Sequence, residues 1–463
     1  PHPLCRGQDP AMADLAPPQP PSPGNKPHVT TKEALNSVSP LLSSARGARI
    51  RRRIFVVTWL AYAGFYFVRQ AFSVAKLGIL DDPAVGSVLT ERALGVIDAV
   101  YLAAYAVGQF LWGMWADRFG PRVVVIGGML GAIGAACVMG VGSALLVFGG
   151  AMVVQGLAQS AGWAPLCKNM GNFFLPAERG RILGLWSTNY AFGALAAPPF
   201  LGWIAYSLFD NWHAAFLGGA ASLAVVFVVF VALQRNEPGD FGIAGAELPA
   251  QGEPDPVEPA RSSGFALYRR TLGDRMVLTL GASYFLLKPA RYAILLWGPV
   301  LVSRRLPEVD KVGATLIPVA FGVAGVVAPI AVGWLSDRVF GSRRVPPCAL
   351  ALGVLTVALA LFMPLTATGS AGVLIAVLAV IGLSVYAADS MISCVAAVDF
   401  GTDDAAGTAA GLVNGCGSVG AILGGLLPGF LSGGALFTIF AVAAFLAGLL
   451  MLPHWNRLPR TAA

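Results

Sequence analysis

The chain has 463 residues, of which 56% are hydrophobic and only 12% are charged, and its formal net charge is +7. A soluble globular protein carries about 25% charged residues, so this composition excludes that class and indicates a protein surrounded by lipid. The positive charge does not predict nucleic-acid binding, because the basic residues gather at the ends of apolar segments. The sequence contains no Walker loop, nucleophile elbow or cluster of metal ligands, so neither an enzyme nor a cofactor is expected.

Apolar segments dominate the chain beyond its first residues. Residues 1–48 are rich in proline and predict a disordered N-terminal segment. The apolar segments that follow are long enough to cross a bilayer as helices, which takes about 20 residues. They lie near 54–80, 91–115, 122–142, 144–174, 181–206, 214–233, 277–303, 312–335, 345–366, 370–397, 405–430 and 434–453. We therefore predict an all-α membrane protein with about twelve transmembrane helices.

The loops between these segments indicate their orientation. Arginines precede the first segment and follow the second, fourth, eighth and last, whereas the opposite loops are poor in Lys and Arg except at Arg304, Arg305 and Lys311. The positive-inside rule then places both termini in the cytoplasm. Residues 234–275 combine prolines with mixed charges and predict a cytoplasmic linker. The linker divides the chain into a first bundle at 49–233 and a second at 276–453, followed by a cytoplasmic tail at 454–463.

The two bundles repeat one motif. Gly113-Met-Trp-Ala-Asp-Arg-Phe-Gly-Pro-Arg122 ends the second span of the first bundle, and Gly333-Trp-Leu-Ser-Asp-Arg-Val-Phe-Gly-Ser-Arg343 ends the second span of the other. Such carboxylates and guanidiniums can latch the cytoplasmic ends of helices in one conformation, and the alternative is that they are solvated loop charges. The candidate latch consists of Asp117, Arg118, Arg122, Asp337 and Arg338.

The repeated motif resembles the signature loop of the major facilitator superfamily. The resemblance implies two bundles of about six helices and a mechanism in which one bundle rocks against the other.

Ionisable residues inside a membrane span are costly and usually functional. The basic ones are Arg69, Lys76, Lys168, Lys288 and Arg291. Arg69 lies 48 residues before Asp117 and Arg291 lies 46 before Asp337, so the two arginines are near-equivalent under the repeat. We expect their guanidiniums to face each other in a central cavity, to lack counter-charges, and to bind an oxyanion such as phosphate.

Other residues near these bases are further candidates for substrate binding. They are Tyr62 and Tyr66 on the helix face of Arg69, Tyr292 beside Arg291, Asn172 and Asp389. Alternatives remain open for most of them: the lysines can pair with buried acids or reach an interface, and the tyrosines can serve packing alone. Asp389 can neutralise a lysine, bind sugar hydroxyls or carry a proton.

The segments around these residues resemble one branch of the superfamily, the organophosphate:phosphate antiporters. The similar segments include Tyr62-Ala-Gly-Phe-Tyr-Phe-Val-Arg69, Arg291-Tyr292 and Arg235-Asn-Glu-Pro-Gly-Asp-Phe-Gly242. In that branch two arginines, one in each half, hold the phosphate, and they fall on Arg69 and Arg291. Its glycerol-phosphate transporters place a lysine at the position of Gln109 and a histidine at that of Asn172, so this chain departs from them.

The resemblance implies a function and a location. It implies exchange of an organophosphate (a sugar phosphate, glycerol phosphate or phosphoglycerate) for inorganic phosphate, by a monomer in the inner membrane of a bacterium. Two alternatives are a proton-coupled transporter of another organic anion and a membrane sensor of sugar phosphate.

Overall fold

The computed structural model describes residues 45–174, 182–183, 185–186, 188–241, 272–341, 343–396 and 406–457. Most of the predicted N-terminal segment, linker and C-terminal tail lies outside these ranges. Residues 45–48, which the sequence assigned to the N-terminal segment, open the first helix.

The secondary structure elements described in the first half are all helices. Its elements are α3 (Ala45–Asp81), α4 (Glu91–Phe119), α5 (Pro121–Val141), α6 (Leu145–Ser160), α7 (Trp163–Phe173), α9 (Thr188–Gly202), the π-helix η1 (Trp203–Leu208), α10 (His213–Leu233) and the short 3-10 turn η2 (Pro238–Phe241). Helix α3 packs against α9 and α10, and α4 packs against α6.

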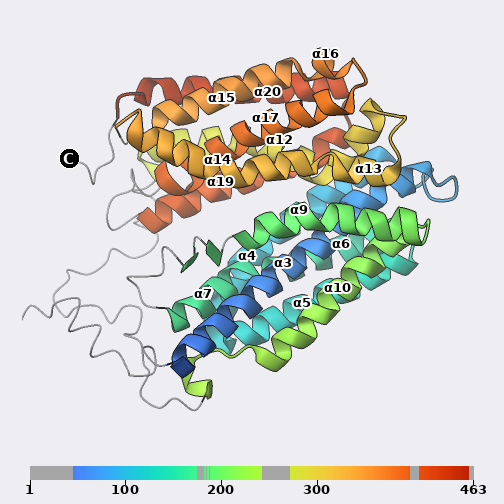
Figure 1. Ribbon diagram of the computed structural model, residues 1–463, viewed down its shortest axis with the longest axis vertical. Helices are drawn as coiled ribbons and strands as arrows, with labels where there is room; N and C mark the ends of the chain where they lie inside the picture. The colour runs from blue at the N-terminus through green and yellow to red at the C-terminus, as the bar shows by residue number, and fades with distance from the viewer. Residues whose placement is uncertain are drawn as a thin grey trace, which may run out of the picture.

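The second half repeats this arrangement. Its elements are α12 (Arg275–Arg305), α13 (Lys311–Leu316), α14 (Val319–Arg338), α15 (Val345–Ala360), α16 (Phe362–Thr366), α17 (Ala371–Ser390), the π-helix η3 (Met391–Ala396), α19 (Ala406–Leu426), the 3-10 turn η4 (Leu427–Gly429), α20 (Gly433–Met451) and the 3-10 turn η5 (Leu452–His454). Helix α12 packs against α19 and α20, and α14 packs against α17. Figure 1 shows the two halves as two groups of roughly aligned helices.

Ten helical segments within the described ranges are long and apolar enough to cross a membrane. They correspond to ten of the predicted spans. Helix α4, with 29 residues, and the shorter apolar helix α15 occupy two more. The all-α class is therefore confirmed, and the total of twelve spans stays a prediction.

Several predicted spans are interrupted. The segment predicted at 144–174 is two helices, α6 and α7, separated at Ala161 and Gly162. A Cβ at Gly162 would lie 3.0 Å from the Tyr62 ring, so the chain passes close to α3 here. The segment at 312–335 is likewise divided before Pro318, which has no N–H to continue the hydrogen bonds of α13. Hydropathy detects neither break, because both lie within continuous apolar sequence.

The two halves meet at the end of the molecule where α3 ends and α4 begins. Gly95 of α4 packs on the backbone at the end of α19 and in η4: a Cβ at Gly95 would lie 2.8 Å from the Leu426 oxygen and 3.2 Å from Cα of Gly429. Two ion pairs also join the halves at this end, Glu91 with Arg304 and Asp81 with Lys311. In Figure 1 the two groups of helices converge near α9 and α13 and diverge toward the left of the view.

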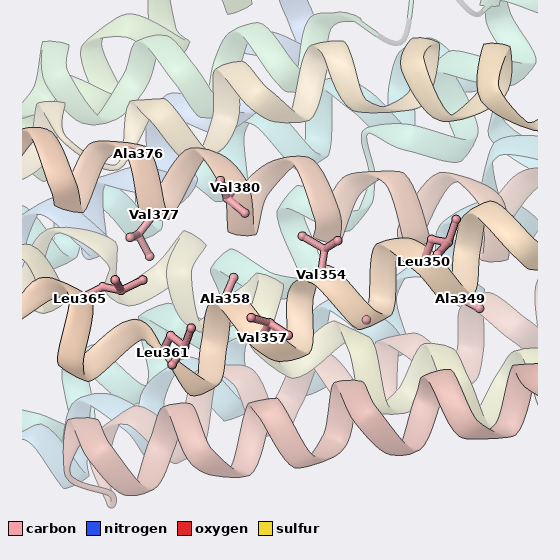
Figure 2. Close-up of a pocket in the computed structure, with 11 residues that line it drawn as sticks. Ala349, Leu350, Val354, Val357, Ala358, Leu361, Leu365, Ala376, Val377 and Val380 are labelled. Carbon is pink, nitrogen blue, oxygen red and sulfur yellow. The ribbon is translucent and has the colours of Figure 1, made fainter.

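An apolar groove of about 630 Å³ lies between α15 and α17 in the second half. Figure 2 shows its lining side chains, among them Leu350, Val354 and Val380, pointing into the space between the two helices. All of the lining residues are aliphatic or glycine. Such a surface suits contact with lipid chains and offers nothing to an anion.

The close approach at Gly95 generates a prediction about conformation. In Gly95→Leu the new side chain meets backbone atoms of the other half, and overpacking of this kind costs about 1–3 kcal/mol. We expect the halves to separate at this end. Spin labels on Val88→Cys and Glu308→Cys, in a background without the native cysteines, should report a longer distance by pulsed electron paramagnetic resonance.

The matched control for this experiment is Gly127→Leu. Nothing lies within 4 Å of a Cβ at Gly127, so the same leucine should leave the spin-label distance unchanged. Equal distances in the parent and in Gly95→Leu would show that this contact does not hold the halves closed.

Candidate functional site

Arg69 lies near the middle of α3 and is held by neutral groups. Its Nε donates to Oε1 of Gln159 at 2.9 Å, and the same oxygen accepts a hydrogen bond from Tyr101 at 2.8 Å. The guanidinium lies over the rings of Tyr66 and Tyr105, 4.6 and 4.8 Å from their centroids. Its Nη2 is buried and has no hydrogen-bond partner among the described residues. The first half therefore presents a positive charge with an unused donor.

Arg291 lies near the middle of α12 and has a different environment. Its Nη1 donates to Oδ1 of Asp389 on α17 at 2.9 Å, and Tyr284 donates to the same oxygen at 3.0 Å. Lys288 makes a longer ion pair with this oxygen at 3.9 Å. The Arg291 guanidinium also lies 4.6 Å from the centroid of the Tyr386 ring.

The expectation that both guanidiniums lack counter-charges is therefore wrong for Arg291. The sequence offered Asp389 as a candidate with three alternative roles, and the structure shows it neutralising a cation. Spacing along the chain could not show this contact, because α12 and α17 are separated by several helices and meet only in the folded bundle. No carboxylate contacts Arg69 within the described part of the chain.

The two arginines lie close to the plane where the halves meet. Ser73, four residues after Arg69, donates to the Leu295 oxygen, four residues after Arg291, at 3.4 Å. Equivalent positions of the repeat are thus in contact. A cavity of about 30 Å³ lies beside this contact, lined among others by Gln70, Ser73 and Tyr386.

The predicted tyrosines contribute in different ways. Tyr66 supplies one face under Arg69. Tyr62 is buried among aromatic rings and packs on Trp163 at 5.1 Å between centroids. Tyr292 lies 5.4 Å from the Lys288 ammonium, measured to its ring centroid. Tyr62 is thus primarily a packing residue, one of the two alternatives that its position allowed.

Lys76 is not among the side chains that contact Arg69 or Arg291. Its ammonium forms an ion pair with Asp98 of α4, donates to the Leu296 oxygen at 3.0 Å and lies 4.1 Å from the Trp297 ring centroid. Lys76 and Asp98 are both fully buried. Of the roles considered for Lys76, the structure shows pairing with a buried acid.

Lys168 and Asn172 lie on α7, away from the arginines. Lys168 donates to the Ala116 oxygen at 3.3 Å, and Asn172 donates to the Asn236 oxygen at 3.1 Å. Asn169, one turn earlier, also donates to the Asn236 oxygen, at 3.1 Å. These amides fasten α7 to the segment that follows α10.

Sequence reasoning missed several residues that surround Arg69 and Arg291. They are Tyr101, Tyr105, Gln159, Tyr284 and Tyr386. One of them left a usable signal: Tyr284 precedes Arg291 by seven residues, as Tyr62 precedes Arg69. Gln159 is a polar residue inside an apolar span, which is the type of position that deserves a functional hypothesis in a membrane.

The comparison with known families decides the class of the protein. A model described as Major Facilitator Superfamily matches residues 54–424 and 308–462. The chain belongs to the major facilitator superfamily. It is therefore an integral multi-pass membrane protein of a transporter family, and not an enzyme.

Curated relatives refine this assignment. The chain is 29% identical to the membrane sensor protein UhpC of Escherichia coli (strain K12) over 435 residues, which cover 89% of this chain and 94% of that protein. It is 26% identical to the glycerol-3-phosphate transporter of Bacillus subtilis (strain 168) over 88% of this chain and 93% of the relative. A probable hexose phosphate transport protein of Chlamydia trachomatis is 24% identical over 88% and 91% of the two chains. These relatives confirm the resemblance to the organophosphate:phosphate antiporter branch.

Solved structures agree on the fold. The crystal structure of a bacterial homologue of the human lysosomal transporter Spinster, in an inward-facing and unoccupied conformation, superposes with a TM-score of 0.67 at 14% sequence identity. The match covers 88% of this chain and 95% of that one. At this identity the likeness concerns the fold alone.

The structure describes part of the superfamily's signature loop, including its turn at Gly120 in the first half. Gly120 turns the chain between α4 and α5 with φ +79°, a conformation that favours glycine. Arg122 donates through its backbone N–H to Oδ1 of Asn236 at 2.9 Å and through Nη2 to the Val231 oxygen at 2.6 Å. Arg118 is exposed and lies over the Phe119 ring, and Arg338 is exposed. The side chains of Asp117 and Asp337 lie outside the described residues, so the latch stays a prediction.

The buried ion pair of Lys76 and Asp98 predicts how substitutions at these two positions change the stability of the protein. Removing one member leaves the other charge buried and unpaired, which costs about 3–5 kcal/mol, whereas replacing both by apolar residues costs much less. We expect Lys76→Met or Asp98→Leu alone to lower the unfolding temperature of the purified protein strongly. The double variant Lys76→Met/Asp98→Leu should recover most of the loss, and two additive losses would show that the residues do not act as a pair.

Proposed function

We propose that this protein is a secondary active transporter that exchanges an organophosphate for inorganic phosphate by alternating access. The observation that carries the proposal is the state of Arg69: among the described residues, its buried Nη2 has no hydrogen-bond partner and its charge meets no carboxylate. A phosphate has enough acceptor oxygens to bond both guanidiniums, one on each half. The relatives that transport glycerol 3-phosphate and hexose phosphate support the same substrate class.

The position of the arginines supports a link between binding and motion. Arg69 and Arg291 are on helices from different halves, and each lies about one helical turn from the Ser73–Leu295 contact. An anion between them would bind Arg69 on one side and the excess positive charge of Arg291 and Lys288 over Asp389 on the other, and so would draw the two halves together. Release would remove this attraction. Substrate occupancy would in this way bias the rocking of the halves.

We further propose that the protein lies in the inner membrane of a bacterium with both termini in the cytoplasm. The arginines in the first turns of α3 and those at the junction of α4 and α5, Arg118 and Arg122, support this orientation by the positive-inside rule. The contacts between the halves would then close the outer side of the membrane. The conformation is accordingly one from which substrate would be released inward.

The exchange assay tests this function directly. Liposomes with the purified protein are loaded with labelled phosphate, and efflux is followed on adding glycerol 3-phosphate, glucose 6-phosphate or 3-phosphoglycerate outside. We expect efflux only with an external organophosphate or phosphate. Arg69→Ala and Arg291→Ala should each reduce it by a factor of about 30 or more, because loss of a buried charged partner costs about 2–5 kcal/mol.

The control for the arginine variants is Arg52→Ala, since Arg52 is exposed near the start of α3 and distant along the helix from Arg69. It should transport as the parent does. Full activity in either Arg69→Ala or Arg291→Ala would refute the site.

A sensor is the second candidate function, and the similarity to UhpC favours it. A sensor would bind the organophosphate without sustained flux. Binding by isothermal calorimetry, combined with the same liposomes, separates the two: tight binding with no efflux supports the sensor. The proton-coupled alternative receives less support, because the carboxylate of Asp389 is engaged in ion pairs with Arg291 and Lys288.

A further inference from the structure

Arg69, Arg291, Lys288 and Asp389 are the charged residues of the candidate site, and we call them the cluster. They are not equally divided between the halves. The first half contributes Arg69, which has no carboxylate partner among the described residues. The second half contributes Arg291 and Lys288 with the single carboxylate of Asp389. Three cations and one anion leave two positive charges. A phosphomonoester carries about −1.5 to −2 charges at pH 7, so it balances this excess.

The contacts of Asp389 are also uneven between its two oxygens. Arg291, Tyr284 and Lys288 all approach Oδ1. Within the described ranges no hydrogen bond reaches Oδ2, and the side chain keeps 14% of its surface exposed. A carboxylate oxygen accepts hydrogen bonds only. Oδ2 is therefore suited to a hydroxyl group and repels a second carboxylate.

We propose that Asp389 is the specificity-determining residue of the site: it limits the accepted anion to two negative charges and binds a hydroxyl of its uncharged organic part. The preferred substrates are then phosphomonoesters of a polyol or sugar. Phosphoglycerates, which carry an additional carboxylate, are disfavoured. This inference rests on the proposed function and narrows its substrate class.

A series of variants that changes the net charge stepwise tests the inference. Asp389→Asn raises the net charge of the cluster to three, Lys288→Gln lowers it to one, and the double variant Asp389→Asn/Lys288→Gln returns it to two. The readout is the ratio of exchange rates for external glycerol 3-phosphate and 3-phosphoglycerate in liposomes loaded with labelled phosphate. Glu308→Gln, which neutralises an exposed carboxylate, is the matched control.

We expect the parent and Glu308→Gln to favour glycerol 3-phosphate, and Asp389→Asn to shift the ratio toward 3-phosphoglycerate by about tenfold or more, the size of effect expected for one buried charge. Lys288→Gln should shift it the other way. The double variant should restore much of the parental charge preference, which a purely structural role for Asp389 does not predict.

The outcomes separate the inference from the function on which it rests. If the parent exchanges no phosphate at all, the proposed function fails. If the parent exchanges phosphate but already prefers 3-phosphoglycerate, or if the ratio is unchanged in Asp389→Asn, only the inference fails. Should Asp389→Asn prove unstable, the shift expected for Lys288→Gln and its reversal in the double variant still decide the question, because equal ratios in both would overturn the inference.

Discussion

A guanidinium inside a membrane protein requires an anion or an extensive set of neutral acceptors, and this protein uses one solution in each half. Arg291 is neutralised by Asp389, whereas Arg69 is held by a glutamine oxygen and two aromatic faces. Neutral contacts stabilise the charge without removing it. The first half thus retains the electrostatic attraction for an incoming anion, and the second half supplies the carboxylate that limits which anion is accepted.

The same two helices carry the arginines and join the halves. Beyond Arg69, α3 continues to Ser73 and Lys76, and both contact the backbone of α12 just beyond Arg291. Lys76 meets this backbone while its own charge is satisfied by Asp98, so the contact between the halves does not depend on the substrate. An anion between the arginines would therefore act next to the place where the halves already touch. In the proposed exchange mechanism, the change in charge on binding would bias the rocking of the halves from a position beside this contact.

Much of this arrangement could be predicted from the sequence. The lengths of the apolar segments predicted where the helices lie, and the internal repeat showed that Arg69 and Arg291 occupy equivalent positions in the two halves. The sequence also named Lys76 and Asp389 but could not assign their partners, because Lys76 and Asp98 are on different helices, as are Arg291 and Asp389. Helical periodicity gives the face of a residue on its own helix and not the neighbour that it meets. The breaks after α6 and before α14 were missed for a related reason, since hydropathy does not report close approach of helices.

The most direct test of the central claim is an experimental structure of the protein with glycerol 3-phosphate, determined by electron cryomicroscopy in lipid nanodiscs. The account predicts phosphate density within hydrogen-bond distance of both Arg69 and Arg291, with the glycerol hydroxyls directed toward Asp389. Density for the ligand near Lys168 on α7, or density that contacts only one of the two arginines, would contradict it.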